Sequence, residues 1–275
     1  MDKKILTVQD ISCVGQCSLT VAMPIISACG IETCILPSAV LSTHTGGFTG
    51  YTFRDLTDDM PLIAKHWLKE GISFDALYTG YLGSEKQIDY VKDIQKSLIK
   101  KGGITIVDPA CADNGKLYYG FDENFVKKMA SLIAVADVAL PNITEASMLT
   151  GEEYKTIYDE NYIERLTDKI LALGAKSIVL TGVSYDENST GVYVKTRDGE
   201  RYYYKHEKIS GGFHGTGDVY ASAFSGMLLN GKTIYKSAEI AADFTLSAIK
   251  NTVGDPTHRY GVKFEKELGF LTKQV

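Results

Sequence analysis

The sequence predicts an α/β domain with a mainly parallel central sheet and helices on both of its faces. Two observations carry this prediction. Short β-like runs alternate with longer helical patterns along the chain, which is the order expected of right-handed βαβ units. In addition, no linker, repeat or low-complexity segment interrupts the 275 residues. We therefore expect residues 1–275 to form a single domain.

The expected strands are short apolar runs, most of which end at a polar residue or a glycine. They cover Ile5–Gln9, Thr33–Leu36, Ala76–Thr79, Ile104–Val107, Val138–Leu140 and Ser177–Leu180, with an antiparallel pair at Gly191–Thr196 and Arg201–His206. Ligands of open α/β sheets bind beyond the carboxyl ends of the strands. The residues at those ends are therefore candidates for a site: Asp10, Gly80, Asp108, Asn142 and Thr181.

The expected helices lie between these strands. The clearest is Glu85–Lys100, where apolar residues recur at helical spacing along one side. The others are Ser18–Ala28, with Pro24 as its weak point, Pro61–Lys69, Phe125–Ala134, Glu145–Leu149, Tyr162–Leu173, Thr216–Leu229 and Thr233–Lys250. The segment Leu41–Phe53 is rich in Thr and Gly and predicts a loop that folds near a ligand.

Composition excludes several classes of protein. An apolar fraction of 44% is enough to bury a large core, and a net charge of −5 argues against a nucleic-acid partner. No apolar stretch reaches the roughly 18 residues of a membrane span, and the apolar run at the N-terminus is too brief for a signal peptide. The five cysteines are an odd number and are expected to be reduced thiols. These features favour a cytoplasmic protein.

A glycine-rich segment, residues 211–218, predicts an anion-binding helix start. Its glycines allow several backbone N–H groups to point in one direction, and the helix expected from Thr216 adds the positive end of its dipole. Such an anion hole suits the charge that develops in phosphoryl transfer. Asp218 could take the proton of a substrate hydroxyl, or it could be an acidic residue that stabilises the first helical turn.

A second glycine-containing segment, residues 226–233, matches the Walker A pattern but is not expected to bind phosphate. A working phosphate loop follows a buried strand and opens a helix, whereas this match ends an apolar helical run. Gly231 is better explained as the residue that follows a helix C-terminus.

Other polar residues allow two interpretations each. Asn142 and Glu145 have the spacing of a capping box, and the same Glu could face a hydrated Mg²⁺. Asp108 and Asp113 could hold cations or form a polar loop. Thr181-Gly182 could contact phosphate or simply end a strand. Four small residues of the last helix are expected to pack in the core, with an adenine-binding face as the alternative: Ala238, Ala241, Ala242 and Thr245.

The run Gly215-Thr216-Gly217-Asp218 resembles the C-terminal signature of ribokinase-like kinases. The resemblance implies a ribokinase-like fold, with Asp218 as the catalytic base and Gly215, Thr216 and Gly217 as the anion hole. It also implies ATP as the phosphoryl donor. Asn142 and Glu145 resemble the N-x-x-E motif of the same superfamily, which helps to place Mg²⁺ and phosphate. By the same resemblance, nucleotide contacts are expected from Asn142, Thr181, Gly182 and Thr216.

Segments in the first half of the chain resemble pyridoxal kinases more narrowly. Residues 41–46 are similar to their F-S-N-H-T segment, residues 79–84 to S-G-Y-L-G-S, residues 8–15 to the Q-S-H-x-x-x-G opening, and residues 108–113 to D-P-x-x-x-D. These matches occur in the family's order over most of the chain. They imply ATP-dependent phosphorylation of the 5′-hydroxymethyl group of pyridoxal, pyridoxamine or pyridoxine by a homodimer.

The same resemblance assigns the remaining site residues. The pyridine ring is expected against Asp10, His44, Thr45 and Tyr81, and metal ions near Asp108, Asp113 and Glu145. A monovalent cation near Asp108 is a further expectation of the resemblance alone.

Two departures bear on the substrate. Asp10 stands where the family usually has Ser, and Leu41 stands where it has Phe. A carboxylate at position 10 could pair with a protonated ring nitrogen or an amine, which would favour pyridoxamine over pyridoxal. A hydroxymethylpyrimidine kinase is the main alternative, although the chain lacks that family's G-S-D-x-S-G-G-A-G-like opening. A non-catalytic vitamer-binding protein is a third, and the intact segment 215–218 argues against it.

Overall fold

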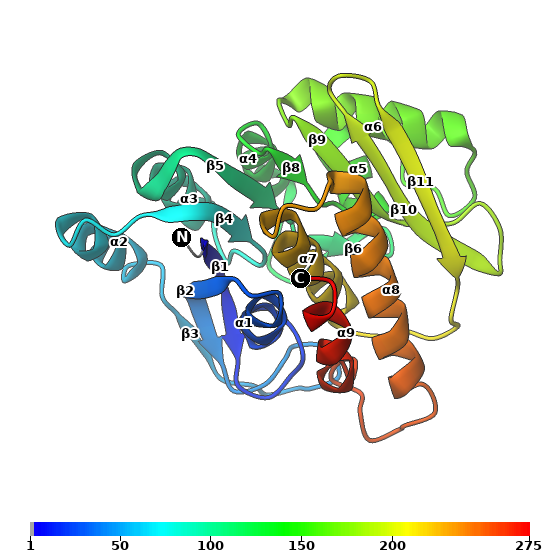
Figure 1. Cartoon of the computed structure of the whole chain (residues 1–275), viewed down its shortest axis with the longest axis horizontal. Helices are drawn as coiled ribbons and strands as arrows, with labels where there is room; N and C mark the ends of the chain where they lie inside the picture. The colour runs from blue at the N-terminus through cyan, green and yellow to red at the C-terminus, as the bar shows by residue number, and fades with distance from the viewer. Residues whose placement is uncertain (1–2) are drawn as a thin grey trace.

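The computed structural model describes residues 3–275, which form a nine-stranded sheet between two layers of helices (Figure 1). Six strands run parallel and in the order β9-β8-β5-β4-β1-β2, and antiparallel strands extend both edges. The sheet strands are β1 (Lys4–Ser12), β2 (Glu32–Leu41), β3 (Phe53–Asp55), β4 (Phe74–Thr79), β5 (Ile99–Val107), β8 (Val138–Ala139), β9 (Ser177–Val183), β10 (Ser189–Thr196) and β11 (Arg201–Glu207). This arrangement confirms the mainly parallel sheet expected from the sequence.

Helices cover both faces of the sheet, as predicted, and each face has its own apolar core. One layer holds α2 (Met60–Lys69), α3 (Glu85–Leu98), α4 (Glu123–Ile133), α5 (Ile143–Thr150) and α6 (Glu160–Leu173). The other holds α1 (Leu19–Ala28), α7 (Thr216–Leu229), α8 (Ile234–Thr252), the 3-10 turn η1 (Glu265–Glu267) and α9 (Leu268–Thr272). In β1, Leu6 and Val8 belong to the first core and Ile5 to the second, because side chains alternate between the faces of a strand.

The structure corrects several predicted boundaries. β2 continues as far as Leu41, and Phe53, the last residue of the expected loop, begins β3, which pairs antiparallel with β2. A small hairpin of β6 (Ala112–Asp113) and β7 (Lys116–Leu117) was not predicted, nor was α9. These elements are only two to five residues long, so they contain too few residues to show a hydrophobic period.

Two local predictions at helix ends are confirmed. The segment that resembles Walker A spans the end of α7, and Gly231 follows that helix with φ 90°. Asn142 and Glu145 form a capping box at the start of α5. Within residues 3–275, no helix is long and apolar enough to cross a membrane.

Candidate active site

A cavity of about 910 Å³ lies at the carboxyl ends of the parallel strands. The site residues that the family resemblance assigned all line it: Asp10, His44, Thr45, Tyr81, Asp108, Asp113, Asn142, Glu145, Thr181, Gly182, Gly215, Thr216, Gly217 and Asp218. Among the described residues that line this cavity, none is Lys or Arg. The cavity therefore brings these residues together, and its ionisable side chains are carboxyl groups, tyrosines, a thiol and imidazoles.

Gly80, the remaining candidate from the strand ends, packs beneath the site instead of lining it. A Cβ atom on Gly80 would lie 2.7 Å from the Gln9 side-chain oxygen. Glycine at this position therefore allows the end of β4 to approach β1 closely, which is a packing role.

Asp10 lies near the end of β1 and is buried, with 6% of its surface exposed. Its carboxyl group accepts hydrogen bonds from two serine hydroxyls: Ser12 Oγ donates to Oδ2 over 2.9 Å and Ser18 Oγ to Oδ1 over 2.5 Å. Burial raises the pKa of Asp10, and the two hydroxyls oppose part of that rise. The result is a fixed, buried acid at one end of the cavity.

His44 stands near His214, with their ring centroids 5.3 Å apart and the rings edge to face. His44 Nδ1 lies 3.2 Å from the Gly46 backbone nitrogen and 3.3 Å from the Gly46 carbonyl oxygen, so Gly46 fixes the orientation of the ring. Burial and the nearby His214 lower the pKa of His44, which favours the neutral form. A Cβ atom at Gly46 would come within 2.7 Å of both rings, so the close approach of the three residues requires glycine.

Tyr81 forms an aromatic wall of the cavity. Its ring stacks on Phe121 with centroids 5.6 Å apart, and Phe121 stacks on Phe125 at 3.9 Å. Burial raises the pKa of Tyr81 to about 12, so its hydroxyl stays protonated at neutral pH. Leu41 and Phe53 also line the cavity. A flat heteroaromatic ligand suits this combination of an aromatic wall and a few fixed polar groups.

The glycine-rich segment begins α7 at the cavity. Gly215 is the N-cap residue, with φ 74°, and a Cβ there would lie 1.9 Å from the Gln16 carbonyl oxygen. Glycine is therefore required at this position both by its backbone conformation and by the close approach of residue 16. A Cβ on Gly217 would meet no neighbouring segment within 4 Å. The unpaired N–H groups of the first helical turn are a suitable site for an anion.

Asp218 lies in the first turn of α7 and is half-buried. Its burial in the cavity raises its pKa to about 8, and the nearby carboxyl groups of Asp108 and Asp10 add to the rise. A carboxyl group with a pKa near neutrality can accept a proton during a reaction. The position of this group beside the first turn of α7 allows it to act on a hydroxyl that attacks phosphorus.

Glu145 and Asp108 form a buried pair of carboxyl groups. Glu145 accepts hydrogen bonds from the backbone N–H of Asn142 over 2.9 Å and of Cys111 over 3.0 Å. Burial raises the pKa of both groups, and the proximity of Glu145 raises that of Asp108 further. A cation near Asp108 would relieve this repulsion.

The three predicted metal ligands do not converge into a cage of protein atoms. Within residues 3–275, no group of three or more His, Cys, Asp or Glu side chains is placed to hold an ion. Both oxygens of Glu145 already accept backbone N–H groups, and exposed Asp113 bonds to Asn114. The arrangement fits an ion that keeps several of its own waters, as Mg²⁺ usually does.

The structure adds residues to the cavity that the sequence reasoning missed. Thr190 and Val192 of β10 and His206 of β11 line it, as do Leu246 and Ile249 of α8. Of the four small residues proposed for α8, Ala238 and Ala241 are fully buried in the core, whereas Ala242 and Thr245 line the cavity. The helical spacing of residues 242, 245, 246 and 249 is the one signal that could have identified this wall.

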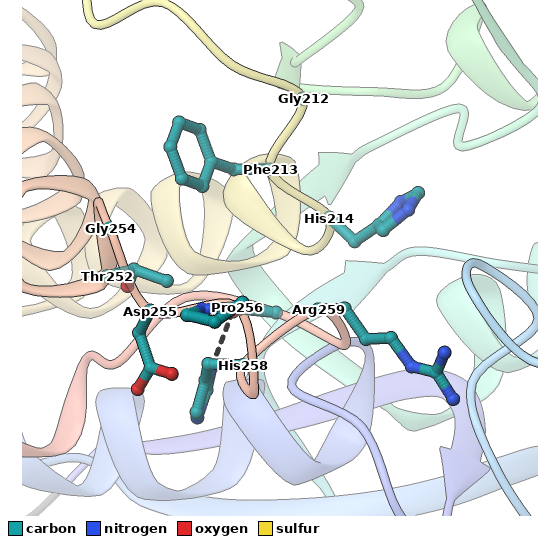
Figure 2. A pocket seen from close by; sticks show the side chains of 10 residues that line it. Gly212, Phe213, His214, Thr252, Gly254, Asp255, Pro256, His258 and Arg259 are labelled. Carbon is teal, nitrogen blue, oxygen red and sulfur yellow. Dashed lines mark hydrogen bonds between the residues drawn. The ribbon is translucent and has the colours of Figure 1, made fainter.

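A second, smaller cavity of about 500 Å³ lies behind the glycine-rich segment and shares Phe213 and His214 with the first (Figure 2). The loop after α8 forms its other side. Figure 2 shows Arg259 extending away from this cavity; its guanidinium carbon lies 5.0 Å from the centre of the Phe48 ring. Tyr260 lies 6.2 Å from the same ring. Through these contacts, the loop after α8 packs against the loop that carries His44 and Phe48.

Comparisons with known proteins identify the family and the fold. The family model described as phosphomethylpyrimidine kinase matches residues 27–261. A hydroxymethylpyrimidine/phosphomethylpyrimidine kinase of Aquifex aeolicus is 30% identical over 197 residues, which are 70% of this chain and 74% of the relative.

Two solved structures share the whole fold. One, from Bacteroides thetaiotaomicron, is provisionally named a phosphomethylpyrimidine kinase and was crystallised with pyridoxal; it is 37% identical with a TM-score of 0.93, covering 98% of this chain and 96% of the other. The other is a pyridoxal kinase from Lactobacillus plantarum, 30% identical with a TM-score of 0.90, covering 98% and 97%. The chain therefore has the ribokinase-like fold, and its relatives carry both pyridoxal and pyrimidine kinase names.

Proposed function

Because the chain belongs to the phosphomethylpyrimidine kinase family, we propose that it transfers the γ-phosphoryl group of ATP to the 5′-hydroxymethyl group of pyridoxal, pyridoxamine or pyridoxine. The observation that carries the proposal is the single cavity that joins an aromatic pocket with a buried acid to a glycine-rich helix start with Asp218. The pyridoxal present in the Bacteroides thetaiotaomicron structure supports this substrate class.

In this proposal Asp218 is the general base. It takes the proton of the substrate hydroxymethyl group as that oxygen bonds to the γ-phosphorus, while the bond from phosphorus to the β–γ bridging oxygen breaks and ADP leaves. The N–H groups of Gly215, Thr216 and Gly217 stabilise the charge on the transferring phosphoryl group. The raised pKa of Asp218, about 8, makes it a stronger base than an ordinary aspartate.

The nucleotide is proposed to lie between the glycine-rich segment and the ends of β8 to β10. Asn142, Thr181, Gly182 and Thr216 would contact its phosphates, as the resemblance implies. Leu246 and Ile249 of α8 line the same cavity and offer an apolar wall for adenine.

Cations are proposed to balance the charge of the triphosphate, because no Lys or Arg is among the described residues that line the cavity. Asp108, Asp113 and Glu145 would hold hydrated Mg²⁺ through water, with a monovalent cation near Asp108 as a further candidate. When bound, Mg²⁺ supplies electrostatic stabilisation of the transferring phosphoryl group. Backbone N–H groups of α7 supply the remaining stabilisation.

Asp10 is proposed to select among substrates. It is buried, fixed by two serine hydroxyls and lies at the aromatic end of the cavity. A carboxyl group held in this way can pair with a protonated ring nitrogen or a substrate amine. This favours pyridoxamine over pyridoxal. Hydroxymethylpyrimidine stays the second candidate, because the Aquifex aeolicus relative carries that name.

The experiment that tests the proposal is Mg·ATP turnover with pyridoxal, pyridoxamine, pyridoxine and hydroxymethylpyrimidine, with the Asp218→Asn variant in parallel. We expect turnover of a B6 vitamer that falls by orders of magnitude in the variant, while ligand binding persists. A protein that binds vitamers without any turnover would be the non-catalytic alternative.

A further inference from the structure

Ser18, the residue before α1, has a backbone conformation that L-residues rarely adopt. Its φ is 52° and its ψ is −134°. The residue is 5% exposed and lines the active-site cavity. A non-glycine residue in such a conformation is strained, and it persists only where the surrounding structure fixes it.

The Ser18 side chain also does not cap α1, although serine is a common capping residue at a helix start. The hydroxyl of an N-cap serine normally accepts a hydrogen bond from an N–H group of the first turn. The Ser18 hydroxyl makes no such bond and instead donates to Asp10 Oδ1 over 2.5 Å. Five other helices, by contrast, have ordinary side-chain caps: Ser84 for α3, Asp122 for α4, Asn142 for α5, Asp159 for α6 and Thr233 for α8.

Asp218 lies close to the same segment. Ser18 and Asp218 line one cavity, and a Cβ at Gly215, three residues before Asp218, would lie 1.9 Å from the Gln16 carbonyl oxygen. The proximity of Asp218 and of Asp10 raises the pKa of the Cys17 thiol, which agrees with this placement. The segment that ends at Ser18 therefore lies between the two acids, and the Ser18 hydroxyl bonds to Asp10.

Close backbone contacts hold this segment on both sides. A Cβ at Gly15 would lie 2.6 Å from His44 Cβ, and one at Gly215 would lie 1.9 Å from the Gln16 carbonyl oxygen. The Gln16 N–H donates to the Tyr260 carbonyl over 3.0 Å. The loop before Ser18 is thus packed between the loop that carries His44 and the start of α7, which explains how the strained conformation is kept.

We propose that Ser18 is a positioning residue: its hydroxyl fixes Asp10 toward the substrate, and its strained backbone keeps the loop before α1 packed against the start of α7, which carries Asp218. One strained residue then sets the relative placement of the substrate pocket and the base. The inference rests on the proposed function, in which Asp10 contacts the substrate and Asp218 is the base.

Two substitutions, Ser18→Ala and Ser18→Gly, distinguish the effect of losing the hydroxyl group from the effect of relieving the backbone strain. Both remove the hydroxyl, and we expect kcat/KM for the vitamer to fall about tenfold in each, with the KM for ATP unchanged. Only glycine relieves the strain, so its melting temperature should exceed that of the alanine variant by about 2–4 °C. Because a flexible glycine no longer keeps the loop packed against the start of α7, which carries Asp218, kcat of the glycine variant should be the lower of the two despite its higher stability.

A double-mutant cycle tests whether the hydroxyl acts through Asp10. In an Asp10→Ala background the hydroxyl has no acceptor, so Ser18→Ala should change kcat/KM very little. Ser27→Ala is the matched control, because Ser27 lies on α1 but outside the cavity. An equal loss in both backgrounds, or an unchanged kcat/KM in the single variant, would overturn the role of the hydroxyl.

A Ser18→Gly variant that is no more stable than the Ser18→Ala variant would refute the claim that Ser18 is strained. If the wild-type protein turns over none of the four substrates, the proposed function fails. The melting temperatures of the single and double variants then still decide whether Ser18 is strained and coupled to Asp10.

Discussion

Gly215 and Gly217 are the two outer glycines of the proposed anion hole. A methyl group added at Gly215 would clash with a neighbouring segment, whereas one added at Gly217 would not, so the two positions together test phosphate binding. Gly217 is exposed, lines the cavity and lies in the first turn of α7, where an added Cβ would meet no neighbouring segment within 4 Å. Alanine favours helix over glycine by up to about 1 kcal/mol. Gly217→Ala should therefore leave the melting temperature unchanged or raise it by about 2–4 °C.

Activity should respond in the opposite direction. If the transferring phosphoryl group lies against the amides of α7, a methyl group at position 217 takes up space that phosphate oxygens need. Donors of an anion hole act at about 2.7–3.1 Å, and the loss of one costs roughly 10²–10³ in kcat. We expect Gly217→Ala to lower kcat by about 10²-fold, measured by coupled ATP turnover beside a thermal melt.

Gly215→Ala is the comparison variant. Its Cβ would lie 1.9 Å from the Gln16 carbonyl oxygen, and its φ of 74° costs an L-residue about 1–2 kcal/mol. This variant should lose both stability and activity. Full activity in Gly217→Ala would refute phosphate binding at that position, and a large fall in its melting temperature would show that the space is not free.

Three further predictions concern the other parts of the site. Asp10→Ser should reduce the kcat/KM ratio of pyridoxamine to pyridoxal by about tenfold, since a charge-assisted contact is lost; an unchanged ratio would reject the role of Asp10. Because Asp218 must be ionised to act as base, kcat/KM should rise with pH through about 8. The same carboxyl group ionises near 3.8 when unfolded, so its contribution to stability falls as pH rises from about 4 to 8, and Asp218→Asn should raise the melting temperature more at pH 8 than at pH 5. Arg259→Ala should raise the KM for the vitamer several-fold but leave the KM for ATP unchanged, because Arg259 packs over the Phe48 ring and so holds that loop. Arg165→Ala, which removes a similar contact with the Tyr162 ring on α6, is the control. Equal effects of the two substitutions on the KM for the vitamer would contradict this prediction.

The fold could be predicted from the sequence where an element was long enough to show a period. α3 and α6 carry apolar residues at helical spacing, and their ends were predicted to within about two residues. β8 has only two residues in its ladder, yet it was found because an apolar run ends at Pro141-Asn142. β3 begins at Phe53, the last residue of the segment whose Thr and Gly content indicates a loop, and its three residues are too few to show a period.

The candidate site could be predicted where strands end and where a local motif exists. The strand-end rule identified Asp10, Asp108 and Asn142, all of which line the cavity. His206 lines the same cavity but belongs to an edge hairpin, and no local pattern shows which way that hairpin folds. Ser18 falls at the start of an expected helix, where serine is common, so its strained conformation had no signal in the sequence.

The three consecutive tyrosines of β11 also have packing partners that the sequence alone did not predict. Tyr203 stacks edge to face with Tyr185, whereas Tyr202 does so with Tyr235 of α8, and the hydroxyl of Tyr204 donates to Asp243 of α8. Residues 202 and 204 therefore share one face and residue 203 the other, as a strand requires. These contacts pack the hairpin onto its neighbours, and no local pattern in the sequence predicts those packing partners.

The most direct test of the central claim is Mg·ATP consumption by the purified protein with each of pyridoxal, pyridoxamine, pyridoxine and hydroxymethylpyrimidine, measured for the wild type and for Asp218→Asn. The account predicts turnover of a B6 vitamer, with pyridoxamine preferred, that is lost by orders of magnitude in the variant. Turnover of hydroxymethylpyrimidine alone, of none of the four, or at an equal rate in the Asp218→Asn variant would contradict it.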